Sequence, residues 1–170
     1  QAEEVDFNIV DAVRNDLVRI RADLFAFNVA RGWDLGVGTL NQVRAGLLAS
    51  TDKYVSEAVE LSDANLSPYT SWEDFQARNQ LSDTVIAQFK QAYPDLVLAA
   101  ADVEAFKLAN PTIALVDGNT VKGIDRVDLW VGGLAEKHIN DGTVGSTFYR
   151  PMDMATNAAM VLAKPAGKQP

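Results

Sequence analysis

The sequence contains no cysteine and a single histidine, two residue types on which many catalytic and metal sites depend. The absence of cysteine excludes disulfide bonds, thiolate metal ligands and a thiol nucleophile. The single histidine is His138, and a metal site there would need further ligands, for which Glu136 and Asp141 are the nearest candidates. A histidine in a solvated loop is the simpler interpretation, so we expect no metal site in this chain.

Long apolar runs and positive net charge are also missing. No run approaches the roughly 20 apolar residues that span a bilayer, so we expect no membrane span. The formal net charge of -8 argues against nucleic acid as a partner. The short motifs of serine hydrolases, zinc proteases, phosphate-binding loops and EF-hands are absent. No signal-peptide pattern opens the chain, and its first residue, Gln1, suggests a start at a processing site.

Helical spacing of apolar residues runs through much of the chain. A helix near residues 8 to 20 is predicted by an apolar residue at every fourth position, namely Val5, Ile9, Val13 and Leu17. Three helix starts are predicted by capping residues, namely Thr39 with Gln42, Thr70 with Glu73, and Ser82. The alanine-rich stretch 96–108 is expected to be helical as well. Only 113–116 is a strand candidate, so we predict a mainly α fold with little or no sheet.

Polar residues are unusually frequent in one apolar, core-like stretch, LFAFNVARGWDLGVGTLNQVR, residues 24 to 44. This stretch resembles the pattern L-x-x-x-N-x-x-R-G-R-D-H-G-x-x-x-Y-N-x-x-R of the animal-type haem peroxidases, the peroxidase–cyclooxygenase superfamily. The matching positions are Leu24, Asn28, Arg31, Gly32, Asp34, Gly36, Asn41 and Arg44. The resemblance implies that this stretch is one wall of a haem site.

A second segment, VDLWVGGLAEKHINDGTVGSTF, residues 127 to 148, is similar to that family's later D-L-W-V-G-G-L-A-E block and the G-x-x-V-G-x-T-F after it. Residues 10 to 18, VDAVRNDLV, also resemble the family's R-N-x-L helix. The best correspondence covers 1–48 and 124–150, whereas 49–123 looks like family-divergent insertions. We therefore treat 1–170 as one segment, the C-terminal part of a haem peroxidase domain, with an extended tail over 164–170.

The family resemblance implies roles for four residues around a haem. Asn28 would accept a hydrogen bond from the second ring nitrogen of the proximal histidine, which fixes the ring and tunes the iron. Arg31 would face a haem propionate, because a guanidinium offers a planar fork of donors. Leu24 and Phe27 would form the proximal wall. Spacings of three and four residues place Leu24, Asn28 and Arg31 on one helix face.

These residues also have a purely structural interpretation. Asn28 could cap or cross-link helices, and Arg31 could pair with Asp34 after the break at Gly32. We assign Asp34, Asn41 and Arg44 to this structural role, in which they satisfy the chain around Gly32, Gly36 and Gly38. Gly132 and Gly133 are expected to allow close backbone packing. Glu136 is expected to be a buried capping or pairing residue.

The departures from the family pattern are large. Trp33 stands where the family has arginine, and Leu35 where it has histidine. The upstream half is missing, and with it the distal histidine and arginine, the proximal histidine and any calcium loop. This chain is therefore expected to contain no catalytic residue and no metal ligand of its own. Iron ligation and any calcium would belong to the missing part.

Two functions remain open at the level of sequence. In the first, the chain is the C-terminal segment of a split or processed haem peroxidase, which oxidises a donor with hydrogen peroxide. Its partners would be the N-terminal portion as a separate chain and a small-molecule or ion electron donor. A bacterial origin would fit this hypothesis, because the chain has no cysteine and animal members of the family are usually disulfide-bonded. We also expect the protein to be secreted. In the second, the chain is a non-catalytic, peroxidase-derived helical module without haem.

Overall fold

The fold is mainly helical with one small sheet, in a computed structural model that describes residues 23–53, 55–56, 65–139 and 144–149. The α-helices within these ranges are α2 (Leu24–Asp34), α3 (Leu40–Leu48), α5 (Trp72–Asn79), α6 (Asp83–Ala92), α7 (Val103–Ala109) and α8 (Leu129–Leu134). A 3-10 turn, η1, covers Gly123–Arg126. The prediction of a mainly α chain is confirmed at this level. The helix expected near residues 8 to 20 lies outside the described residues.

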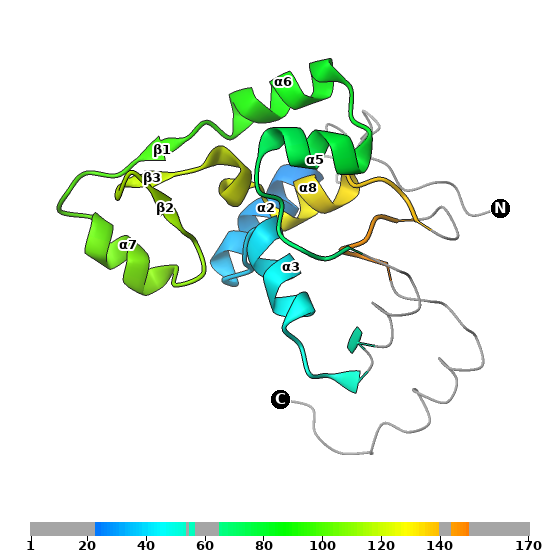
Figure 1. Ribbon diagram of the computed structural model, residues 1–170, viewed down its shortest axis with the longest axis horizontal. Helices are drawn as coiled ribbons and strands as arrows, with labels where there is room; N and C mark the ends of the chain where they lie inside the picture. The colour runs from blue at the N-terminus through cyan, green and yellow to red at the C-terminus, as the bar shows by residue number, and fades with distance from the viewer. Residues whose placement is uncertain (1–22, 54, 57–64, 140–143, 150–170) are drawn as a thin grey trace.

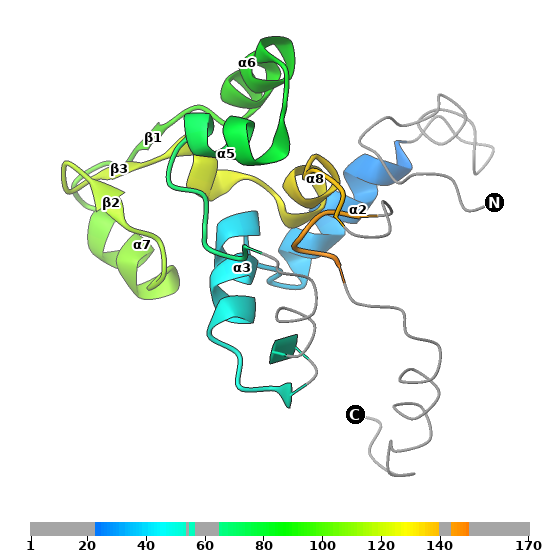
Figure 2. The same cartoon turned by 45° about the vertical axis from the view of Figure 1, so that its right-hand side comes forward.

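The sheet has three short antiparallel strands in the order β1-β3-β2. They are β1 (Leu96–Val97), β2 (Leu115–Val116) and β3 (Thr120–Val121). In Figures 1 and 2 these strands and α7 form a lobe to one side of α3, α5 and α8. β2 falls inside the predicted strand candidate 113–116. It turns into β3 through two left-handed residues, Asp117 and Gly118, whose φ angles are 52° and 82°.

One predicted helix is wrong over its first half. Residues 96–108 were expected to be helical throughout, but Leu96 and Val97 pair with β3, and α7 begins only at Val103. The Asp95 carboxylate accepts a hydrogen bond of 2.7 Å from the backbone N–H of Gly123, which ties the residue just before β1 to the start of η1. Strand pairing with a distant segment therefore overrides the helix propensity of the alanines.

The predicted capping residues hold at two of three helix starts. Thr39 and Gln42 form a complete capping box at α3, and the Ser82 side chain caps α6. At α5 the cap is one residue later than predicted, because Ser71 rather than Thr70 accepts from the backbone N–H of Asp74, at 3.1 Å. The displaced Thr70 N–H instead donates to the Asp74 carboxylate.

The core lies where α3, α5, α6 and η1 meet. Its buried apolar members are Leu40, Tyr69, Phe75, Ile86, Phe89, Ile124, Val127 and Ala135. Phe75 is fully buried and meets Tyr69 and Phe89 edge-on, with ring centroids 4.8 and 5.3 Å away. Such edge-to-face pairs stabilise a core beyond the area that they bury.

Close packing of α8 against α3 depends on Gly132, as predicted from the double glycine. A Cβ atom at Gly132 would lie 2.5 Å from Leu40 Cδ2 and 2.7 Å from Val127 Cγ1. Both neighbours are fully buried, so they have no free space into which to move. A Cβ at Gly133 would likewise collide with the Phe148 ring.

Replacing two helical glycines should therefore have opposite effects on stability. Gly132→Ala is expected to lower the free energy of unfolding by about 1–3 kcal/mol through overpacking. Gly46→Ala, inside α3, is the matched control, because its Cβ would meet no atom within 4 Å. That variant should gain about 0.5–1 kcal/mol from the lower backbone entropy of the unfolded chain. Urea unfolding followed by circular dichroism measures both, and a neutral Gly132→Ala would contradict the packing argument.

Candidate functional site

The predicted haem-facing residues lie on α2, a short helix with a capping residue at its start. The Asp23 carboxylate accepts from the Ala26 backbone N–H at 3.0 Å and starts the helix. Gly36, with a φ of 70°, follows its last turn, and the Val37 backbone N–H donates to the Gly32 carbonyl at 2.9 Å. Backbone groups thus close the glycine break, without help from Asp34.

The described part of the chain leaves the predicted face of α2 largely uncovered. No residue of α2 is buried. Asn28 and Arg31 are exposed, Leu24 is half-buried, and 56% of Phe27 is accessible. Neither Asn28 nor Arg31 forms a side-chain hydrogen bond with any described residue, so the alternative pairing of Arg31 with Asp34 is not observed there.

Trp33, one of the two departures from the family pattern, connects the two motifs. Its indole N–H donates to Asp128 Oδ1 at 2.5 Å, directly before α8. The other oxygen of Asp128 accepts from the Tyr93 hydroxyl at 2.7 Å. Burial, followed by this hydrogen bond to Asp128, raises the pKa of Tyr93. Leu35, the second departure, is 66% exposed at the C-cap of α2.

A buried ion pair forms a second connection between the motifs. Arg44 Nη1 lies 2.5 Å from Glu136 Oε1, and both side chains are fully buried. The same carboxylate accepts from the Tyr69 hydroxyl at 2.8 Å and from the Thr147 backbone N–H at 2.7 Å. Burial lowers the pKa of Arg44, and the Glu136 charge opposes that shift. Burial and then the Glu136 charge raise the pKa of Tyr69, so its phenol stays a donor.

The prediction that Glu136 is a buried pairing residue is confirmed. The prediction that Asn41 and Arg44 satisfy the chain at the glycine break is wrong, because their hydrogen-bond partners lie elsewhere. Asn41 donates to the Tyr69 carbonyl at 2.9 Å and to Asp125 Oδ1 at 2.7 Å. Arg44 reaches the carbonyls of Asn65 and Ser67 as well as Glu136. These polar residues therefore tie α3 to segments more than 20 positions away, which spacing within the motif could not indicate.

No cluster of three or more histidine, cysteine, aspartate or glutamate side chains suited to a metal ion occurs in the part of the chain that the structure describes. His138 is half-buried in the segment that follows α8. In the same described ranges, no helix combines the length and the apolar character needed to cross a bilayer.

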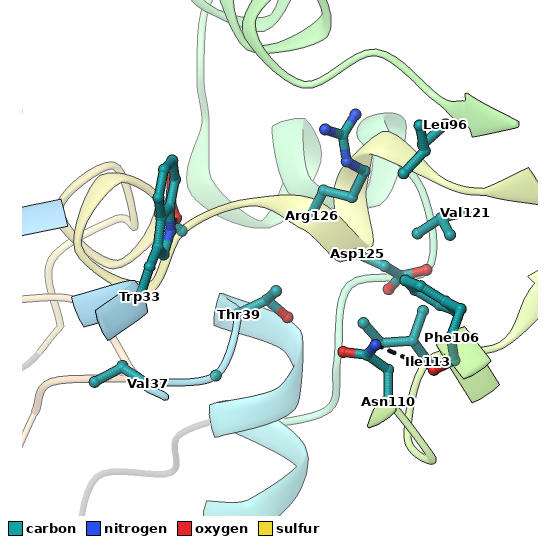
Figure 3. Close-up of a pocket in the computed structure, with 12 residues that line it drawn as sticks. Trp33, Val37, Thr39, Leu96, Phe106, Asn110, Ile113, Val121, Asp125 and Arg126 are labelled. Carbon is teal, nitrogen blue, oxygen red and sulfur yellow. Dashed lines mark hydrogen bonds between the residues drawn. The ribbon is translucent and has the colours of Figure 1, made fainter. Parts of the chain in front are cut away.

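A pocket of about 240 Å³ is lined by Trp33 in the last turn of α2 and by Leu96 and Val121 of the sheet. Figure 3 shows Trp33 at one end of it and Phe106, Asn110 and Ile113 at the other. Asp128 lines it at the Trp33 end, where it accepts the indole hydrogen bond, and Figure 3 shows Asp125 beside Phe106. This pocket could not be predicted from the sequence, because its walls come both from the motif segments and from the divergent region 49–123.

No protein-family model, curated protein or solved structure matches this chain. The resemblance to the haem peroxidases therefore rests on the sequence motifs alone.

The Arg44–Glu136 pair is expected to be the most sensitive polar contact of the fold. Glu136→Gln keeps the shape of the side chain but leaves the Arg44 charge buried without a counter-charge. Such a change typically costs about 3–5 kcal/mol of unfolding free energy. Chemical denaturation of the purified variant measures this loss.

The matched control is Glu104→Gln, since Glu104 pairs with Lys107 at 3.0 Å on the surface, where its side chain is 85% exposed. Its unfolding midpoint should not change measurably. Equal losses of unfolding free energy in the two variants would show that the buried pair contributes no more to stability than a surface pair.

Proposed function

We propose that this chain is the C-terminal segment of a split or processed haem peroxidase and supplies the surroundings of the haem on its proximal side. The observation that carries the proposal is the face of α2 around Asn28 and Arg31. Two residues with strong hydrogen-bonding groups stand there beside the exposed ring of Phe27. The described residues give the two polar side chains no partner, which is what a face taken from a larger assembly would leave.

The residues of this face fit the chemistry of a haem group. The Arg31 guanidinium suits a propionate, and the Asn28 amide oxygen can accept the N–H of an imidazole that ligates iron. Phe27 and Leu24 offer apolar contact to a macrocycle. When bound, haem supplies the reaction with hydrogen peroxide and the oxidation of a donor. The chain's own residues would hold a propionate and orient the proximal histidine, which we expect on the missing N-terminal portion.

The joined motifs add support to the same proposal. Arg44–Glu136 and Trp33–Asp128 fix α3 and the end of α2 relative to α8. A site that must hold a ligand in one geometry needs such a rigid frame behind it. The proposal does not specify the electron donor. It includes an extracellular location for the enzyme.

The alternative function is a non-catalytic helical module that is derived from a peroxidase and binds no haem. Trp33 favours it, because its indole already has a structural partner in Asp128. Leu35 favours it too, since an exposed leucine has replaced a residue type able to bind metal or transfer protons. In this alternative, the uncovered face of α2 would serve only as a contact surface.

Protein purified from its natural source separates the two functions. A processed peroxidase should show a second polypeptide on a denaturing gel, and mass analysis should find the histidines in that polypeptide. The native complex should have the absorbance of haem. A single 18.4 kDa species without this absorbance would support the non-catalytic module instead.

Asn28→Ala tests the residue on which the proposal depends most. In the assembled enzyme, loss of the acceptor should shift the haem reduction potential and reduce peroxidase turnover by about 10- to 100-fold. Asn28→Asp should also shift the potential, because a carboxylate increases the imidazolate character of the ligand.

The control is Gln88→Ala, which removes an exposed amide from α6. It should leave both the potential and the turnover unchanged. If Asn28→Ala folds normally and also leaves both unchanged, Asn28 has no role at the haem and the proposal loses its main support.

A further inference from the structure

The pocket between Trp33 and Phe106 has mostly apolar walls with a few polar groups, as small-molecule sites commonly do. Among its lining residues, Val121 is buried, and Phe106 and Ile113 are half-buried. Its volume of about 240 Å³ exceeds the roughly 150 Å³ of an apolar cavity that holds benzene. A ligand with one aromatic ring and a short side chain therefore fits this space.

The polar groups of the pocket favour a positively charged ligand. Both oxygens of Asp128 already accept hydrogen bonds, from Trp33 and from Tyr93. Asp125 Oδ1 accepts from Asn41, whereas Oδ2 accepts no hydrogen bond from any described residue. One carboxylate oxygen of Asp125 is thus free to receive a donor from a ligand, and Asp128 adds a second negative charge.

The one cation among the lining residues, Arg126, does not neutralise this free oxygen. Its guanidinium donates to the Pro94 carbonyl. In Figure 3 the Arg126 side chain extends away from Asp125 and Phe106. Neither carboxylate of the pocket forms an ion pair within the described residues, so the pocket keeps a negative character.

From this geometry we propose that the pocket binds a one-ring arylalkylamine, with the ring on Phe106 and Ile113 and the ammonium group on Asp125. The aromatic ring fills the apolar end, and the ammonium donates to the oxygen that lacks a partner. A neutral ligand would leave the two carboxylates uncompensated, and an anionic one would be repelled by them. This site does not depend on haem, so its test is independent of the test of the proposed function.

The test is a titration of the ¹⁵N-labelled 170-residue chain with 2-phenylethylamine, followed by NMR. The indole N–H signal of Trp33, assigned with the Trp33→Phe variant, should shift and saturate with a Kd of about 1 mM. The neutral analogue 2-phenylethanol should bind roughly fivefold more weakly, on the scale of one partly exposed ion pair. Phenylacetate should not bind.

Two variants locate the site. Asp125→Asn should reduce the affinity for the amine to that for the alcohol, while the amide oxygen still accepts from Asn41. Asp117→Asn is the matched control, because it removes the same charge from an exposed turn outside the pocket, and it should leave the affinity unchanged. Ile113→Trp fills the apolar end and should abolish binding of both ligands.

The proposal is overturned by any of four results: no saturable shift with the amine, equal affinity for amine and alcohol, tighter binding of phenylacetate, or an unaltered affinity in Asp125→Asn. Signal dispersion in each spectrum reports whether the variant is folded. Because Asp125→Asn preserves the shape of the side chain, it tests the charge even if Ile113→Trp fails to fold.

Discussion

The buried pair of Arg44 and Glu136 is the contact on which the rest of this fold depends. It joins α3 to the end of α8, and the same two side chains also hold Tyr69 and Thr147. Two ions removed from water are tolerated only when their remaining hydrogen-bonding groups are satisfied. Here every such group has a partner, since the described residues contain no buried side-chain nitrogen or oxygen without one. Asn41 and Arg44, the buried polar residues of an apolar motif, therefore form its internal frame.

Local sequence patterns correctly predicted those features of the fold that depend on residues close together in the chain. The capping box at Thr39 and the cap at Ser82 involve residues three positions apart, so their geometry follows from spacing alone. β1 could not be predicted in this way, because Leu96 and Val97 are strands only through their pairing with Val121 and Thr120. The alanines after them favour a helix, but pairing with residues 23 or more positions away makes Leu96 and Val97 a strand.

The same distinction applies to the candidate site. Helical spacing places Leu24, Asn28 and Arg31 on one face, and α2 has the helical form that this requires. Glu136 was predicted as a buried pairing residue, but its partner Arg44 lies 92 positions away and could not be identified from spacing. Tyr69 gave no signal at all, although both Arg44 and Arg78 stack on its ring at 4.3 Å. Its role arises only when three separate segments meet.

Trp33 attaches the end of α2 to the start of α8, at a position where the haem peroxidase pattern that the sequence resembles has arginine. Arginine and tryptophan differ in charge and shape, but both carry an N–H that can donate to a carboxylate. The indole makes this bond to Asp128, so the end of α2 stays attached to the start of α8. Asn28 and Arg31 lie on the other side of Gly32, where no described residue satisfies them. The contacts with Asp128 and Glu136 account for Trp33 and Arg44, whereas Asn28 and Arg31 take no part in this frame.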